Sequence, residues 1–208
     1  MRVTAAPART VVDGGWALTA WPLDRRLSYL PTGADDLEPP YAAADAWPPP
    51  HPLSLSANLC DRILVAASYS KPTPSGNGTY FHDPELTDAD RQQVLERFQR
   101  ANEVWWQVEV TRWELGVKRY EVGERHAPHQ DLHAGAARRK FAGTVQLSDP
   151  ADYEGGQLVM HFAEDRAVMP VQRGTLVALP GWTVHEVTPV TAGERWSLCV
   201  NAWGSPLR

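Results

Sequence analysis

The spacing of apolar residues changes along the chain from a helical period to a period of two. Over residues 88–106 apolar side chains recur every three or four positions, which is typical of an amphipathic helix. Thr87 precedes this segment and can accept a hydrogen bond from the backbone N–H of Asp90. The sequence therefore predicts a capped helix that packs against a sheet. Residues 53–70 form another apolar segment, compatible with a short helix or a strand.

Beyond residue 106 apolar and polar positions alternate, which predicts short strands. Gly, Pro and Asp residues separate them, a pattern typical of a sandwich or barrel. The expected strands are 106–110, 113–117, 118–122, 141–147, 157–162, 175–179, 185–190 and 196–202. Gly116 is expected to mark a bend between the second and the third.

The first part of the chain, residues 1–55, is rich in Pro, Ala and Asp. Two strand-like pieces occur at 9–12 and 16–21. Two proline runs follow, at 39–40 and 48–50, and favour loops because proline fixes φ and lacks an N–H donor.

Composition and charge limit the class of protein. The 208 residues are 43% hydrophobic, and the formal net charge of −5 argues against a general nucleic-acid binder. No apolar run approaches the roughly 20 residues of a membrane span, and residues 1–21 lack the apolar stretch of a signal peptide. The cysteines, Cys60 and Cys199, lack metal-type spacing, so we expect reduced, mostly buried thiols in a cytoplasmic protein.

We expect residues 1–208 to form a single domain. Residues 110–204 are its core, and residues 1–109 are an N-terminal extension with a supporting helix. Five of the nine residues at 71–79 are Pro, Gly or Asn, which predicts a flexible loop. This loop is interpreted either as a lid over a site or as a plain surface loop.

The main candidate for chemistry is a pair of residues, His129 and Asp131, followed by a distant histidine, His185. Two imidazoles and one carboxylate can hold Fe(II) on one face and leave other positions open for substrates. Side chains alternate along a strand, so His129 and Asp131 are expected to point the same way, at the end of the strand that starts at Lys118. His185 must then come from a neighbouring strand.

Arg195 lies ten residues after His185 and begins another strand candidate. A buried guanidinium binds a carboxylate through two parallel hydrogen bonds, and Ser197 faces the same side of the strand and can add a hydroxyl. This pair suits the distal carboxylate of 2-oxoglutarate, whose keto-acid end would chelate iron. Alone, Arg195 could equally form a surface ion pair.

At this point the sequence resembles the Fe(II)/2-oxoglutarate-dependent dioxygenases of the prolyl-4-hydroxylase type. The likeness covers about residues 110–204. It rests on the ordered segments YEVGERHAPHQD (120–131), RRK (138–140), YEGGQL (153–158), VQRG (171–174) and HEVTPVTAGER (185–195). It implies a mostly β, cupin-like double-stranded β-helix (jelly roll) with supporting helices. It also implies iron at the triad and 2-oxoglutarate at Arg195.

Several positions of this family pattern carry further expectations. Tyr120 falls where relatives often place a tyrosine that hydrogen-bonds the cosubstrate, and His126 where an aromatic residue commonly precedes the metal-binding pair. Gln146 departs from the pattern, because many relatives have an aromatic residue there that helps to bind 2-oxoglutarate. Asn201 and Trp203 lie near a tryptophan seen late in the family.

The resemblance also implies a reaction. Relatives that halogenate lack the carboxylate at the position of Asp131. Its presence here favours hydroxylation, or else desaturation or ring formation. O2 and 2-oxoglutarate would be consumed, succinate and CO2 released, and ascorbate is a candidate reductant. The expected substrate is a small molecule, a free or peptidyl amino acid, or a specialised metabolite, with no nucleic-acid or membrane partner.

Other charged residues near the motifs receive plainer interpretations. His133 is expected on a loop rather than as a ligand, and His161 to face either the mouth or the solvent. The basic cluster at 138–140 is a solvated turn or a clamp for a substrate carboxylate, and Glu154 and Glu186 are expected to be exposed.

Two alternative functions remain open at this stage. One is a cupin-like metal-dependent enzyme, such as an isomerase or hydrolase, that uses no 2-oxoglutarate. The other is a non-catalytic binding module on the same scaffold. The oligomeric state is left open.

Overall fold

The structure is a computed structural model that describes residues 10–12, 15–17, 54–162 and 165–206. Its helices are α2 (Ala57–Tyr69) and α3 (Asp88–Trp105), with short 3-10 turns η2 (Ala134–Ala136) and η3 (Pro150–Asp152). Its strands are β1 (Thr10–Val12), β2 (Gly15–Ala17), β3 (Pro72–Ser75), β4 (Gly78–His82), β5 (Arg112–Tyr120), β6 (His126–His129), β7 (Arg139–Gln146), β8 (Tyr153–Gly155), β9 (Leu158–Phe162), β10 (Asp165–Val168), β11 (Leu176–Pro180), β12 (Val184–Val187), β13 (Val190–Gly193) and β14 (Arg195–Trp203).

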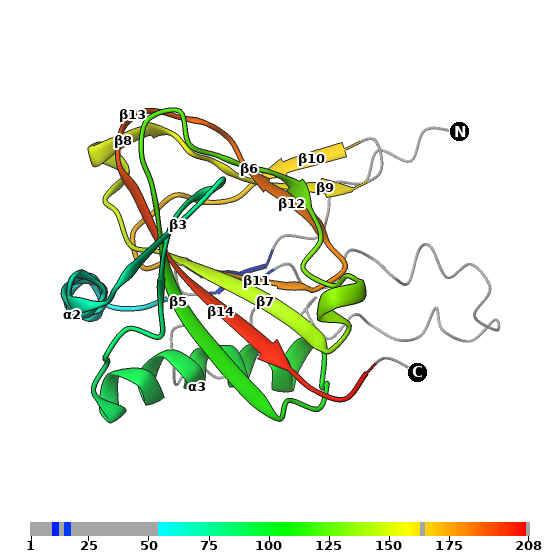
Figure 1. The fold of residues 1–208 in the computed structure, drawn as a ribbon. Coiled ribbons are helices and arrows are strands. Elements are labelled where there is room, and N and C mark those ends of the chain that lie inside the picture. Colours follow the sequence, from blue (N-terminus) through cyan, green and yellow to red (C-terminus); the bar gives the residue numbers. More distant parts are fainter. Residues whose placement is uncertain (1–9, 13–14, 18–53, 163–164, 207–208) are drawn as a thin grey trace.

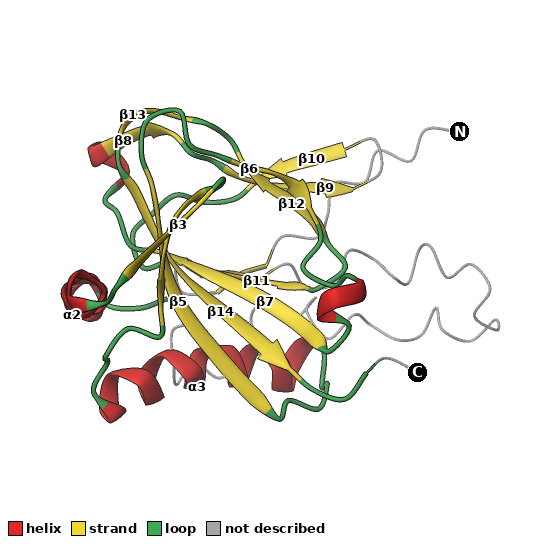
Figure 2. Ribbon diagram, viewed as in Figure 1, coloured by secondary structure: helices red, strands yellow, loops and turns green. Residues whose placement is uncertain are grey.

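The described strands form two facing sheets and a small ribbon (Figure 2). The eight-stranded sheet has the order β1-β2-β11-β7-β14-β5-β4-β3, the four-stranded sheet the order β10-β9-β12-β6, and β13 pairs with β8. Both helices lie on the side of the large sheet away from the small one (Figure 1). This is the predicted mostly β roll with supporting helices.

The two faces of the large sheet have different chemistry because side chains alternate along each strand. On β5, Leu115 and Val117 pack toward the helices, in a core cluster that includes Phe98 of α3. The alternate residues, such as Lys118 and Tyr120, face the four-stranded sheet. The helix-facing side therefore supplies an apolar core, and the inner side carries the polar groups.

The helix predictions are confirmed. Thr87 caps α3, accepting a hydrogen bond from the N–H of Asp90 at 3.1 Å. Ser56 caps α2 in the same way, accepting from the N–H of Leu59 at 3.3 Å, and this decides the open choice for residues 53–70 in favour of a helix. No helix in the described part of the chain is long and apolar enough to cross a membrane.

Some strand predictions are wrong in position. Residues 113–117 and 118–122 form one continuous strand, β5, and Gly116 is no bend. A side chain at Gly116 would overlap the ring of Tyr80, so the glycine makes room for that ring. Residues 106–110 form a loop, held by the Asn102 side chain, which donates to the carbonyl of Val108 and accepts from its N–H. The sequence reading also missed β8 and β10.

The stretch at 71–79 is a β-hairpin and not an irregular loop. Pro72 and Pro74 lie in β3, which is the edge of the sheet and pairs only with β4. An edge strand tolerates proline because one side of its backbone makes no ladder hydrogen bonds. The Pro-rich composition that suggested a flexible loop is therefore compatible with an edge strand.

The N-terminal predictions are tested only in part. The strand-like pieces at 9–12 and 16–21 correspond to β1 and β2 where the structure describes them. The proline runs at 39–40 and 48–50 lie outside the described residues.

Candidate functional site

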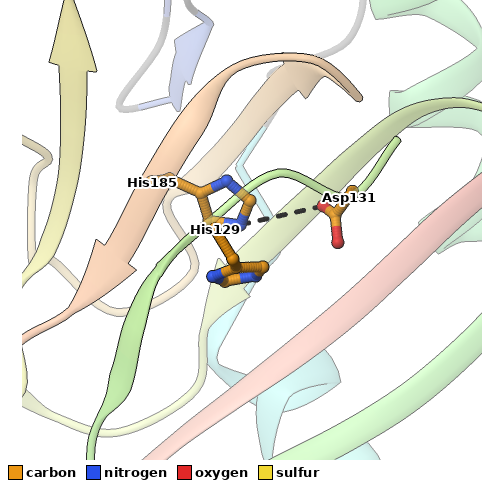
Figure 3. A group of neighbouring side chains, drawn as sticks. All are labelled: His129, Asp131 and His185. Atoms are coloured by element: carbon orange, nitrogen blue, oxygen red, sulfur yellow. Dashed lines mark ion pairs between the residues drawn. The ribbon is translucent and has the colours of Figure 1, made fainter. Parts of the chain in front are cut away.

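Three side chains predicted to bind iron converge on one point (Figure 3). His129 ends β6, Asp131 lies two residues beyond it, and His185 lies on β12, which pairs directly with β6 so that His185 is opposite His129. The neighbouring strand expected for His185 is thus present. The predicted location of His129 on the strand that starts at Lys118 is wrong, because β5 ends at Tyr120 and β6 belongs to the other sheet.

The geometry of this triad suits one metal ion. One ligand atom from each of His129, Asp131 and His185 can be chosen so that all lie within 4.8 Å of one another. Nε2 of His185 is 3.7 Å from Oδ2 of Asp131, the pair drawn in Figure 3. Donor atoms that share an ion through bonds of about 2.1 Å lie roughly 3–4 Å apart. Small side-chain movements would complete the coordination.

Backbone carbonyls orient both imidazoles. Nδ1 of His129 is 2.8 Å from the carbonyl oxygen of Ala127, and Nδ1 of His185 is 3.0 Å from that of Thr183. A carbonyl can only accept, so each Nδ1 carries the proton and each Nε2 has a free lone pair. A metal-binding histidine usually donates its other ring N–H to such an acceptor, which fixes the orientation of the ring.

Electrostatics favour the neutral form of the His129 ring and of the neighbouring His126 ring. Burial lowers the pKa of His129, and the neighbouring His185 lowers it further. His126 stacks on His129 with ring centroids 3.7 Å apart, and burial followed by the charge of Lys118 lowers the pKa of His126 to about 3. Neutral imidazole is the form that binds a metal.

Asp131 is held by a partner that the sequence reading assigned differently. Nη1 of Arg139 donates to Oδ1 of Asp131 at 2.7 Å, and the side chains are only 20% and 13% exposed. The other carboxylate oxygen, Oδ2, is the one near His185. Within the basic cluster 138–140, Arg139 is thus neither a solvated turn residue nor free to clamp a substrate. It orients the carboxylate of the triad.

The triad opens onto a cavity of about 410 Å³ between the sheets. Its floor is the inner face of the large sheet and includes Lys118, Tyr120, Arg195, Ser197, Cys199 and Asn201. The antiparallel register sets Tyr120 beside Arg195 and Lys118 beside Ser197. The three residues expected to bind the cosubstrate therefore lie together, in the same cavity as the triad.

Arg195 is the largest fully buried side chain and is 1% exposed. Its Nη2 donates to Oε1 of Gln146 at 2.8 Å, whereas its Nε and Nη1 are buried and have no hydrogen-bond partner among the described residues. Gly156 makes room for its stem, because a Cβ there would lie 2.9 Å from Cδ of Arg195. Buried donors that lack a partner are costly, so an anion that accepts from them would be bound strongly. A carboxylate fits this position, and the surface ion pair considered for Arg195 is excluded by its burial.

The sequence reading missed several cavity residues. Lys118, 7% exposed, faces the cavity, and Tyr80 and Glu114 line it as well. Alternation along β5 could have drawn attention to Lys118, because it lies two residues before Tyr120 on the same face. The position of Tyr80 depends on the hairpin, which the sequence did not predict.

The remaining candidates lie outside the triad. His133 is exposed and accepts from the N–H of Gly135 at the start of η2, as expected of a loop histidine. Nε2 of His161 is 3.0 Å from a carboxylate oxygen of Glu186, whose side chain is 18% exposed, so the prediction that Glu186 is exposed is wrong. Glu154 is exposed as predicted. Of the two late residues, Asn201 lines the cavity.

Comparisons with known proteins agree with this geometry. Residues 115–203 match the family model described as the 2OG-Fe(II) oxygenase superfamily. A PKHD-type hydroxylase of Nitrosomonas europaea is 40% identical over 62 residues, which are 30% of this chain and 27% of that protein. The PKHD-type hydroxylase PiuC of Pseudomonas aeruginosa is 37% identical over 70 residues, 33% of this chain and 31% of that protein.

The fold comparison extends further along the chain. A Pseudomonas putida prolyl-4-hydroxylase structure superposes with a TM-score of 0.61 at 23% identity, over 73% of this chain and 89% of that one. A Trichoplax adhaerens prolyl hydroxylase, solved with a hypoxia inducible factor peptide fragment, gives 0.58 at 15% identity, over 72% and 80%. The arrangement of the sheets is therefore the fold of these two structures.

Residues 115–203 are therefore similar to the 2OG-Fe(II) oxygenase superfamily. That family implies Fe(II), 2-oxoglutarate and O2 as cofactor and cosubstrates, and the triad is compatible with iron. The segment that matches the curated relatives spans only about a quarter to a third of their length.

Proposed function

We propose that the protein is a non-haem Fe(II)- and 2-oxoglutarate-dependent oxygenase that hydroxylates an unactivated C–H bond and releases succinate and CO2. The observation that carries this proposal is the placement of a candidate metal-binding triad and a buried guanidinium with two donors still to be satisfied on the walls of one cavity. The expected substrate is a free or peptidyl amino acid or a specialised metabolite. Desaturation or cyclisation would use the same site.

Each residue has a defined part in this reaction. His129, Asp131 and His185 would hold the iron, which supplies open coordination positions for the 2-oxo acid and for O2. Arg195 would bind the distal carboxylate of 2-oxoglutarate through its free donors, with the hydroxyls of Ser197 and Tyr120 on the same floor. Burial raises the pKa of Tyr120, so its hydroxyl stays protonated and remains a hydrogen-bond donor.

The chain also controls where the reaction takes place. Arg195 lines the cavity and is only 1% exposed, so bulk water is largely excluded from its guanidinium. We propose residues 110–204 as the catalytic core of one domain and residues 1–109 as its extension. The β3–β4 hairpin would then act as the lid, since Thr73, Ser75 and Tyr80 line the cavity.

A test begins with anaerobic protein, Fe(II) and 2-oxoglutarate, for which we expect a visible charge-transfer absorption. His129→Ala should lose both the absorption and Fe(II) binding. The matched control is His133→Ala, which removes an exposed histidine four residues away in the sequence and should retain both. Folded wild-type protein that binds Fe(II) but gives no absorption would support a cupin-like enzyme without 2-oxoglutarate. Failure to bind any divalent metal would support a non-catalytic module.

The reaction type requires a product. Succinate formation and O2 consumption should be measured over panels of amino acids, peptides and small metabolites. A product heavier by one oxygen atom indicates hydroxylation, and one lighter by two hydrogen atoms indicates desaturation or cyclisation. Stoichiometric coupling of succinate to product identifies the preferred substrate.

A further inference from the structure

Lys118 is a buried amine that faces the cavity from β5. The residue is 7% exposed and lines the cavity next to Ser197, its antiparallel partner on β14. Its Nζ lies 3.5 Å from Nδ1 of His126. Burial lowers the pKa of Lys118 because the ammonium ion loses solvation.

Two cationic side chains, Lys118 and Arg195, line the same cavity and lie near the same aromatic ring. Nζ of Lys118 lies 5.0 Å and Cζ of Arg195 lies 5.4 Å from the centroid of the Tyr120 ring. Among the described residues neither cation forms an ion pair with a carboxylate, whereas Arg139 does so with Asp131. Like charges in a desolvated site repel each other, and an anion bound between them would remove that repulsion.

Gln146 gives a reason for a second cation. Its amide oxygen accepts a hydrogen bond from Nη2 of Arg195 at 2.8 Å. One donor of the guanidinium is thus used within the protein. A neighbouring ammonium would restore the donor and the charge that a carboxylate needs.

We propose that Lys118 is a second carboxylate-binding residue, which acts with Arg195 on the distal carboxylate of the cosubstrate. This inference rests on the proposed function, since it concerns the 2-oxo acid of that reaction. The site then favours a dicarboxylic 2-oxo acid over a monocarboxylic one, because the charges of Lys118 and Arg195 both act on the distal end.

The test compares Lys118→Met, which keeps the apolar stem and removes the charge, with Lys118→Arg, which retains a cation. Lys140→Met is the matched control, because Lys140 is also buried, at 9% exposure, yet lies outside the cavity and packs beside Gly204. Thermal melts establish that each variant is folded. Binding of succinate to the metal-free protein is measured by calorimetry, which reports the distal site without iron and without turnover.

We expect Lys118→Met to weaken binding of succinate and of 2-oxoglutarate by about 10- to 100-fold, the loss typical of one charge-assisted hydrogen bond. Lys118→Arg should recover most of it, and Lys140→Met should match wild type. The KM for 2-oxoglutarate should rise in Lys118→Met while kcat at saturating cosubstrate changes little.

Two results would overturn the inference alone. One is wild-type-like binding of succinate and 2-oxoglutarate by Lys118→Met. The other is a rise confined to the KM of the oxidised substrate, which would assign Lys118 to that molecule. If wild-type protein with Fe(II) neither binds 2-oxoglutarate nor releases succinate from it, the proposed function fails together with this inference.

Discussion

Gln146→Glu should weaken cosubstrate binding by placing a carboxylate of the protein against Arg195. The two side chains are 2% and 1% exposed, and Oε1 of Gln146 lies 2.8 Å from Nη2 of Arg195. Glutamate has nearly the same shape as glutamine, so packing is preserved. The guanidinium keeps the introduced carboxyl group ionised, since a nearby cation favours the charged form.

The magnitude follows from the charge that this exchange introduces. An incoming carboxylate would meet a like charge roughly 5 Å away, and at an effective dielectric constant of about 20 this repulsion is about 3 kcal/mol. Such an energy corresponds to an affinity loss of about 100-fold. We therefore expect the dissociation constant of 2-oxoglutarate to rise by about two orders of magnitude.

The assay is titration of 2-oxoglutarate into the anaerobic Fe(II) protein, followed by the charge-transfer absorption. Gln146→Leu is the control, since it removes the acceptor without adding a charge and should weaken binding by less than about tenfold. Fe(II) affinity should be unchanged in both variants. A loss below threefold in folded Gln146→Glu, or equal losses in the two variants, would refute the assignment of Arg195 as the carboxylate-binding residue.

Three further predictions test the site and its scaffold. Arg139→Gln removes the donor that orients the triad carboxylate, and Fe(II) titration should show affinity lowered by about 10- to 100-fold; unchanged affinity would contradict this. Gly143→Ala would place a methyl group on the ring of Phe98, so the unfolding free energy should fall by about 1–3 kcal/mol, and an unchanged melting temperature would contradict tight packing. Arg62 holds the pKa of Asp90 below its usual range. The ion pair therefore contributes stability that is present above about pH 4 and is lost as pH falls through the lowered pKa. The difference in melting temperature between wild type and Asp90→Asn should close in acid, and a constant difference would contradict this.

The candidate triad was predictable because its signal is local. The pair His129 and Asp131, with His185 before Arg195, carries metal-ligand chemistry in residue type and order alone. Alternation along a strand was enough to place Ser197 on the same face as Arg195. Helix α3 was also predictable, since a clear period and a capping threonine specify it without tertiary contacts.

Other features depended on contacts between distant segments. Composition at 71–79 cannot distinguish an irregular loop from an edge strand, because the difference lies in whether β4 pairs with it. Likewise, the sequence predicts a bend at Gly116, whereas the structure shows that the glycine makes room for the ring of Tyr80. The strand of His129 was misplaced because sequence proximity to Lys118 gave no sign that the chain changes sheets between residues 120 and 126.

The sequence by itself determined the rolled β fold, the helix that supports it and the set of residues able to bind iron and a carboxylate. The strands, the helix and the candidate residues follow from periodicity and residue chemistry, which are properties of short segments, whereas the rolled form of the fold is what the resemblance to a known family implies. Only the tertiary structure decided that Arg139 holds Asp131, that Gln146 holds Arg195 and that Lys118 lines the same cavity as Arg195 and the triad. Those relations depend on strand register and burial, which bring together side chains that no local pattern connects.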